Sequence, residues 1–239
     1  PYQLSSQWTA LFSKNDLAVK NIKNGDSEIV IKGNPSLARL SPQGYYAYGY
    51  NQVDSTWYTH NLKKSKYTEL TRGKIFYNEL SDYPNYPSSY GIAGWSKNDK
   101  TIFIYDRYDI WEFDPDTGNS KRLTNGRESK TSYRLISLDN EIKFIDTSKK
   151  LLMITFNELT KNSGYYEFDY KKNIGQQLLD GPYRYSSPKK ARLSEDIIYT
   201  RQSFIEYPDI RLSNLNFKSD KIISNANPQQ TDYNWGTSE

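Results

Sequence analysis

Apolar residues in this chain occur in short runs that polar turns separate, as residues 95–124, WSKNDKTIFIYDRYDIWEFDPDTGNSKRLT, illustrate. The apolar runs TIFIY and DIWEF are separated by charged or polar-ringed residues, and a turn-like PDTG then leads into a short polar run. Runs of this length that are bounded by turn residues predict β-strands. In residues 101–105 consecutive positions are apolar, which predicts a strand that is covered on both faces.

The same order of features recurs along the chain: a polar turn, an apolar strand, a variable gap, an aromatic strand, a second turn and a short strand that often ends in Leu-Thr. We identify full copies at residues 40–71, 95–124, 146–179 and 193–224, and a shorter copy at residues 8–31. Self-similarity of this kind predicts a repeat architecture. Aligning the aromatic strands places Trp57, Ile110, Tyr165 and Ile210 in register, about 45–55 residues apart.

Each full copy has room for one earlier strand before its polar turn. These strands are predicted at residues 36–40, 91–95, 133–138 and 189–193. Four antiparallel strands in a unit of about 40–50 residues indicate a β-propeller. We therefore predict an all-β chain, a single propeller domain or propeller segment over residues 1–239. Its blades are expected at about residues 1–33, 34–72, 91–125, 133–180 and 188–230. These five copies form either a closed ring or an arc of a larger ring of seven or eight blades.

Antiparallel connectivity sorts the loops between the two ends of each blade. The turns after the first and third strands share one end, whereas the connections after the second and fourth strands share the other. The second set varies in length and is rich in aromatic residues, especially residues 72–90. Because loops on a rigid scaffold commonly carry binding residues, we expect substrate contacts at that end. The candidate residues are Glu79, Asp82, Tyr83, Tyr86, Tyr90, Asp106, Arg107, Tyr108, Asp109 and Glu206.

The amino-acid composition favours β-strands and argues against nucleic acid as a partner and against a membrane-spanning segment. The 239 residues include 22 Tyr and one Met, and Tyr suits strands. The net charge of +4 is spread over 32 basic and 28 acidic residues. No dense basic stripe appears, since residues 63–66 (KKSK) fit a solvated hairpin tip, and we predict no nucleic-acid partner. No apolar run is long enough to span a membrane. The chain begins without Met, in strand-like sequence, so we expect a piece of a longer protein.

The sequence lacks the residue patterns that catalytic and metal-binding sites require. The only histidine is His60, in a predicted strand, and no G-x-S-x-G elbow is present, so a Ser-His-Asp triad cannot be assembled here. The absence of cysteine excludes disulfides. Residues 114–119 (DPDTGN) have the D-x-D-x-G spacing of calcium loops but lack the closing Glu, and they also fit a hairpin turn. We predict no catalytic residue, no metal site and no cofactor in this chain.

Paired carboxylates for glycoside hydrolysis are an alternative that the residues leave open. Such a pair requires acids on facing elements. Acidic residues at the predicted binding end are Glu79, Asp82, Asp106, Asp109, Glu158 and Glu206. Tyr83, Tyr86 and Tyr90 could form a platform for sugars, or, with the interspersed Pro84 and Pro87, a packed and rigid loop.

Three stretches of the chain resemble a known family. Residues 37–62 (LARLSPQGYYAYGYNQVDSTWYTHNL), residues 90–115 (YGIAGWSKNDKTIFIYDRYDIWEFDP) and residues 227–237 (NPQQTDYNWGT) are similar to the N-terminal propeller of bacterial prolyl-oligopeptidase-family, dipeptidyl-peptidase-like serine peptidases. The S-P-x-G turn is shared with TolB-like propellers. The resemblance implies a C-terminal α/β-hydrolase domain as partner, with the catalytic Ser, Asp and His beyond Glu239. It also implies peptide substrates, which the propeller gates and helps to bind, and a periplasmic or secreted location.

Two departures from the family pattern and one alternative function accompany this resemblance. No contiguous Glu-Glu pair occurs, so the family's capture of the substrate amino terminus is not carried over to any residue here. Five copies are also fewer than the family's usual blades, and an incomplete ring would leave unpaired edges and apolar faces that favour self-association. The alternative function is a free-standing binding propeller for a protein, peptide or carbohydrate partner.

Overall fold

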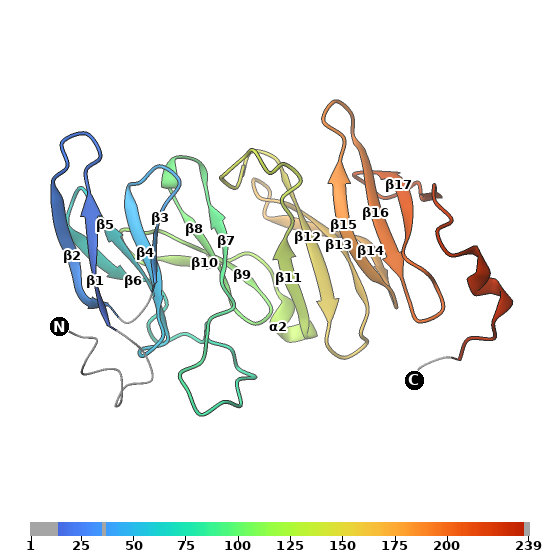
Figure 1. Cartoon of the computed structure of the whole chain (residues 1–239), viewed down its shortest axis with the longest axis horizontal. Coiled ribbons are helices and arrows are strands. Elements are labelled where there is room, and N and C mark those ends of the chain that lie inside the picture. The colour runs from blue at the N-terminus through green and yellow to red at the C-terminus, as the bar shows by residue number, and fades with distance from the viewer. Residues whose placement is uncertain (1–13, 35–36, 237–239) are drawn as a thin grey trace. The chain divides into compact units, whose positions relative to one another are not determined.

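The computed structural model describes residues 14–34 and 37–236, which form two compact units of β-sheet. The first unit holds the described residues up to Asn125 together with Lys143–Ile145, and the second holds Gly126–Ile142 and the described residues from Asp146 onward. In the described part, four sheets have four strands each and one sheet has two (Figure 1). Within each sheet, strands that follow one another in the chain lie next to each other and pair antiparallel. The predicted all-β class and the four-stranded antiparallel unit are therefore confirmed.

The first unit contains a hairpin and two four-stranded sheets. The hairpin is β1 (Asn15–Lys20) with β2 (Ser27–Asn34). One sheet is β3 (Ala38–Leu40), β4 (Tyr46–Asn51), β5 (Thr56–Asn61) and β6 (Lys66–Glu69). The other is β7 (Ile92–Trp95), β8 (Ile102–Tyr105), β9 (Ile110–Phe113) and β10 (Ser120–Arg122), with a 3₁₀ turn at Lys97–Asp99 between β7 and β8. The predicted first blade begins in residues 1–13, which lie outside the described residues.

The second unit contains two four-stranded sheets and short helical turns. One sheet is β11 (Thr131–Leu135), β12 (Lys150–Asn157), β13 (Ser163–Asp169) and β14 (Ile174–Gly181), preceded by the helical turn α2 (Gly126–Ser129). The last sheet is β15 (Arg184–Lys190), β16 (Asp196–Gln202), β17 (Asp209–Asn214) and β18 (Lys221–Ile222), followed by a 3₁₀ turn at Pro228–Asp232.

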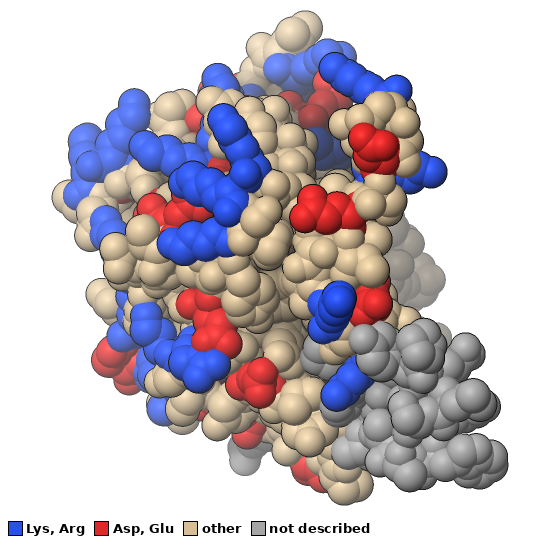
Figure 2. Space-filling model, turned by 90° about the vertical axis from the view of Figure 1, so that its left-hand side faces the viewer, with Lys and Arg blue, Asp and Glu red and all other residues tan. Residues whose placement is uncertain are grey.

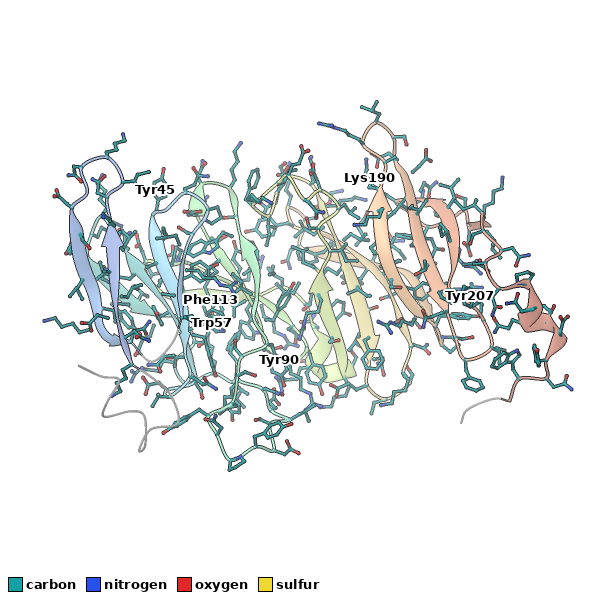
Figure 3. The ribbon with its side chains drawn as sticks, in the orientation of Figure 1. Tyr45, Trp57, Tyr90, Phe113, Lys190 and Tyr207 are labelled. Carbon is teal, nitrogen blue, oxygen red and sulfur yellow. The ribbon has the colours of Figure 1, made fainter. Side chains whose placement is uncertain are left out.

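Aromatic side chains build the core of each unit, which explains the high tyrosine content. In the first unit Trp95 stacks on Tyr46 at 5.4 Å and meets Tyr48 edge-on at 5.3 Å, and the core extends to Trp57 and Phe113 (Figure 3). In the second unit Tyr165, Tyr185, Tyr199 and Phe217 pack together with Ile197. All of β8 is buried, as its unbroken apolar run predicts.

The Leu-Thr ending of the repeat is explained by a hydroxyl that fastens the fourth strand to the third. The hydroxyl oxygen accepts a hydrogen bond from the backbone N–H at the start of the third strand. This N–H has no backbone partner in the ladder between the two strands, and the hydroxyl satisfies it. The pairs are Thr71 with Trp57 at 2.9 Å, Thr124 with Ile110 at 3.2 Å and Ser224 with Ile210 at 2.8 Å. Tyr165 pairs with Leu179 at the corresponding place in β13, so the predicted register of the four aromatic strands holds.

Two first strands lie earlier in the sequence than predicted. The strand expected at residues 133–138 is β11, Thr131–Leu135, and the strand expected at residues 189–193 is β15, Arg184–Lys190. In β15 the pairing with β16 shifts between Ser186 and Lys189, so an irregular strand replaces a regular one. After β11 the chain makes a long connection instead of a short turn, and Ile145 in that connection is buried in the first unit, where its N–H donates to the carbonyl of Trp95 at 2.7 Å.

Basic residues on the first unit are partly neutralised by their neighbours. Figure 2 shows Lys and Arg side chains gathered over one part of the face it presents, with acidic side chains among them. At the hairpin tip between β5 and β6, Lys64 pairs with the carboxylate of Asp116, and Lys66 donates to the Asp116 carbonyl at 2.5 Å. These pairings agree with the predicted hairpin tip at residues 63–66.

Candidate functional site

The aromatic connection of residues 72–90 is fastened at its base and exposed at its tip. Phe76 is buried in the core of the first unit, and the Asn78 N–H donates to the Ser88 carbonyl at 2.6 Å. The Glu79 N–H donates to the hydroxyl of Tyr90 at 2.9 Å. Tyr83, in contrast, is 79% exposed. The loop is therefore packed where it meets the sheet, and only its tip offers an aromatic surface.

The remaining candidates in this connection lie between those extremes. Glu79 and Tyr90 are half-buried, Asp82 is exposed, and Tyr86 is 38% exposed. The backbone carbonyl of Tyr86 accepts a hydrogen bond from the Gln52 side chain at 2.6 Å, and the hydroxyl of Tyr50 donates to the Pro87 carbonyl at 3.2 Å. The connections after β4 and after β6 thus lie together at one end of the sheet, as the antiparallel order predicts.

The charged connection between β8 and β9 is closed to solvent. Asp106 is 4% exposed, and its carboxylate accepts the N–H of Tyr108 at 2.8 Å and the indole N–H of Trp111 at 3.1 Å. Asp109 is fully buried and accepts the Thr124 hydroxyl at 2.6 Å and the Arg122 Nε–H at 3.0 Å. These carboxylates hold the connection in shape and are closed to solvent, an arrangement that favours a structural role over the predicted substrate contact.

Arg107 and Tyr108 differ within the same connection. Tyr108 is 2% exposed, whereas the Arg107 side chain is half-buried, with its guanidinium 5.1 Å from the Tyr108 ring centroid. A cation above an aromatic face is weakly attracted by the ring. Arg107 is therefore the only one of the four predicted residues in this connection with a partly exposed side chain.

The last sheet brings charged side chains from β16, from β17 and from the connections that follow these two strands together around Glu206. The Glu206 carboxylate accepts hydrogen bonds from Arg201 Nε at 2.8 Å and Nη2 at 3.0 Å, and from Arg211 Nη2 at 2.8 Å. Arg211, which is 5% exposed, also pairs with Asp220. The Arg201 guanidinium lies 4.3 Å from the ring centroid of Tyr183. We call these four residues, Arg201, Glu206, Arg211 and Asp220, the arginine–carboxylate network.

The network sets the ionisation of Glu206. Burial by itself would raise the pKa of this carboxyl, but the hydrogen bonds from Arg201 and Arg211 outweigh it and hold the pKa below its ordinary value. The hydrogen bond to Glu206 raises the pKa of Arg201 in turn. Glu206 is therefore ionised at neutral pH. It is a fixed acceptor and not a proton donor, which argues against a general-acid role in glycoside hydrolysis.

Beside the network the last sheet has a hollow of about 430 Å³. Its wall includes Arg201, Glu206 and Arg211, the aromatic residue Tyr207, and the segment after β18, with Tyr233 and Trp235. The exposed fractions are 42% for Tyr207, 67% for Tyr233 and 48% for Trp235, and Figure 3 labels Tyr207 at this end of the sheet. The Trp235 ring meets Phe204 edge-on at 6.2 Å, and its indole N–H donates to the Gln230 carbonyl at 2.8 Å.

Of the residues in this site, sequence reasoning found only Glu206. Arg201 and Arg211 were missed, although each interrupts or ends an apolar strand, in IIYTR and DIRLS. A charge in such a strand is seldom buried without a partner, and that was the available signal. The Nε atom of Arg211 is buried and has no hydrogen-bond partner among the described residues.

The calcium-like spacing at residues 114–119 belongs to a hairpin turn. The Asp114 carboxylate accepts the N–H groups of Asp116 at 2.9 Å and Thr117 at 2.8 Å, and Gly118 has φ of 75°. Asp116 accepts the Asn61 side-chain amide at 2.8 Å. Over residues 14–34 and 37–236, no group of three or more His, Asp or Glu side chains could hold a metal ion. His60 is 5% exposed, and burial lowers its pKa.

Comparison with known proteins establishes the fold. No protein-family model and no curated protein sequence matches the chain. Among solved structures, dipeptidyl peptidase 4 of Porphyromonas gingivalis aligns with a TM-score of 0.55 at 12% identity, over 91% of this chain and 36% of that one. A Bacteroides ovatus protein described as a dipeptidyl aminopeptidase IV aligns at 0.54 and 14% identity, over 86% and 32%. Oligogalacturonate lyase of Vibrio parahaemolyticus aligns at 0.54 and 10% identity, over 88% and 59%.

The chain thus spans about three fifths of the lyase and about a third of each peptidase. At these identities the likeness concerns the fold alone, and it confirms the propeller fold that the repeats and the family resemblance predict. Within the described residues, no helix combines the length and apolar character that crossing a membrane requires.

Proposed function

We propose that this chain is the noncatalytic propeller region of a serine peptidase of the prolyl oligopeptidase family, which gates and helps to bind peptide substrates. The observation that carries the proposal is the hollow in the last sheet, where exposed Tyr207, Tyr233 and Trp235 surround a fixed arginine–carboxylate network. Tyr, Trp and Arg are the residue types that dominate the energetics of protein and peptide recognition.

The geometry of the network favours binding over chemistry. Arg201 and Arg211 are held by Glu206 before any ligand arrives, so little side-chain entropy is lost when a peptide binds. Arg201, whose side chain is 23% exposed, can donate to peptide carbonyls, and the aromatic rings can cover apolar side chains of the peptide. None of these groups is an activated nucleophile, which agrees with a region that binds substrate for another domain.

The fold likeness supports a peptidase parent. Two proteins with the same fold are described as dipeptidyl peptidases, and this chain covers about a third of each. We infer that an α/β-hydrolase domain carrying the catalytic Ser, Asp and His lies in the same parent protein, beyond Glu239. The division of residues 1–239 as one propeller region, a periplasmic or secreted location and self-association of the isolated region belong to the same proposal. Size-exclusion chromatography with light scattering measures whether the isolated region self-associates.

Titration calorimetry with short unstructured peptides tests the binding role. Trp235→Ala and Tyr207→Ala are each expected to weaken peptide binding by about 1–2 kcal/mol, roughly a tenfold loss of affinity. Tyr45→Ala is the matched control, because Tyr45 is 56% exposed on the first unit, before β4. Peptide binding that survives both changes in the last sheet, or that is lost equally in the control, would contradict the proposal.

The parent gene distinguishes the proposal from its alternative. A G-x-S-x-G elbow followed by Asp and His after Glu239 is the expected finding. If no hydrolase domain follows and peptides still bind at the hollow, the chain is a free-standing binding propeller instead.

A further inference from the structure

A second hollow, of about 350 Å³, lies on one face of the sheet formed by β11–β14. Its lining includes Tyr133, Thr155, Thr160, Asn162, Gln177 and Asp180. Tyr133 pairs with Thr155, Thr155 with Gly164, and Gly164 with Asp180, so these positions form one row across all four strands. Residues that are directly opposite in neighbouring strands share a face of the sheet. We call this site the β11–β14 groove.

Glycine at position 164 lets the Leu179 carbonyl and the Gln177 side chain come close to the middle of the row. A Cβ atom there would lie 1.8 Å from the Leu179 carbonyl oxygen and 2.8 Å from Gln177 Nε2, so no larger residue fits. The pairing of β13 with β14 shifts just after this point, between Tyr165 and Tyr166, which brings the backbone of β14 close. The row therefore lacks a side chain between Thr155 and Asp180.

Hydrogen bonds fix the polar groups that line the groove. Gln177 Nε2 donates to the Leu179 carbonyl at 2.6 Å and to the Thr155 hydroxyl at 3.2 Å. Asn162 Nδ2 donates to Asp180 Oδ2 at 2.9 Å. Neither Gln177 Oε1 nor Asp180 Oδ1 accepts a hydrogen bond from the described residues. The groove thus presents two oriented acceptors that remain available to a ligand.

The connection between β12 and β13 forms one rim, and the Asn157 side chain helps to hold it in place. Asn157 Oδ1 accepts the N–H groups of Leu159 and Thr160, both at 2.9 Å, and its Nδ2 donates to the Thr131 hydroxyl at 2.9 Å. A rim held in this way needs little reordering when a ligand binds, which lowers the entropic cost of binding.

The chemistry of the lining selects a class of ligand. No Lys or Arg side chain lines the groove, so an anion has no partner there, and the single carboxylate already accepts a hydrogen bond from Asn162. Threonine hydroxyls and side-chain amides supply the remaining polar surface. We propose that the β11–β14 groove binds a neutral sugar, whose adjacent hydroxyl groups donate to Asp180 Oδ1 and Gln177 Oε1 and accept from threonine hydroxyls. Its volume lies within the range of roughly 300–1,000 Å³ that is usual for small-molecule sites.

The experiment is a ligand-observed NMR screen of the 239-residue chain, followed by titration calorimetry. The panel holds neutral mono- and disaccharides, an amino sugar and a short peptide. At least one neutral sugar is expected to bind. Asp180→Ala should then weaken its binding by about tenfold or more, because a hydrogen bond to a charged acceptor is lost. Thr160→Trp should block the groove and abolish binding.

Leu159→Trp is the matched control, since Leu159 neighbours Thr160 in the same connection, is 74% exposed and does not line the groove. Circular dichroism of each variant separates loss of binding from loss of fold, and the blocked variant keeps the test valid if Asp180→Ala does not fold. Failure of every neutral sugar to bind would overturn the inference, as would binding that Thr160→Trp leaves intact. Binding of the amino sugar alone, with affinity that falls as salt is added, would overturn it in favour of a cation site. Peptide binding at the last sheet is measured in a separate experiment. Sugar binding at the β11–β14 groove and peptide binding at the last sheet can therefore each be confirmed or refuted without the other.

Discussion

The connection between β8 and β9 and the connection between β16 and β17 hold the same place in their sheets but differ in what they expose. In each case an Asp, Asp109 or Asp209, stands directly before an Ile of the third strand. Its carboxylate accepts a hydrogen bond at 2.6 Å from a hydroxyl at the end of the fourth strand, Thr124 for Asp109 and Ser224 for Asp209. We call this hydrogen bond the lock. This hydrogen bond occurs in two of the four four-stranded sheets that the structure describes, since Thr56 and Gly164 stand at the corresponding positions of the other two. A charged residue at this position is no evidence of a site.

The two connections differ in the side chains that surround this hydrogen bond. In the first unit Trp111 and Arg122 close over Asp106 and Asp109, which leaves both carboxylates buried. In the last sheet the corresponding loop keeps Tyr207 exposed and fixes Glu206 between two arginines. The same hydrogen bond therefore lies in a buried connection of one sheet and beside exposed side chains in the other, and we expect substitutions in the two surroundings to have different effects.

Asp109→Ala is expected to have the largest effect on stability. The substitution removes a fully buried carboxylate that accepts hydrogen bonds from Arg122 and Thr124, and we expect a loss of about 3 kcal/mol in the free energy of unfolding. Urea denaturation measures it. Asp209→Ala, at the more exposed lock, is the comparison and should cost clearly less. Equal losses would show that burial does not distinguish the two locks.

Arg211→Met should come next in size. The change keeps the packing of the side chain but removes the more buried of the two arginines that Glu206 and Asp220 share, and we expect a loss of about 2 kcal/mol. Arg201→Met is the matched control, because the Arg201 side chain is 23% exposed against 6% for Arg211. A larger loss in the control would mean that Arg201, and not Arg211, anchors the network.

The acid response of the last sheet should be the smallest of these effects. The folded-state pKa of Glu206 is lowered, so its contribution to stability is complete above the unfolded-state pKa of about 4.3 and is lost as pH falls through the folded value. We expect the free energy of unfolding to fall below about pH 4, and to fall less in Glu206→Gln. Thermal melts between neutral and acidic pH measure this, and identical pH profiles for the two proteins would contradict the assigned role of Glu206.

Much of the fold is predictable from the sequence because the repeat is local. Apolar runs such as TIFIY, the hairpin turn at residues 114–119 and the hydroxyl of Thr124 all act within a single four-stranded unit. The shifted start of β15 was not predictable, since an irregularity in its pairing with β16 decides it. The long connection after β11 was not predictable either, because Ile145 packs against Gly94 of a different sheet.

The site is less predictable because burial and charge pairing depend on how the folded sheet brings side chains of different strands together. Asp106 and Asp109 are charged residues in a connection, and only Trp111 and Arg122 on the neighbouring strands make them structural. Glu206 was found by its place in a loop, whereas its partners Arg201 and Arg211 lie on two different strands that only the sheet brings together.

Backbone amide chemical shifts recorded during titration with a short peptide test the central claim most directly, because they report on both connections in one experiment. We expect saturable shifts at residues 203–211 and 225–235 of the last sheet, and none at residues 106–109. Shifts that concentrate at residues 106–109, with the last sheet unchanged, would contradict it.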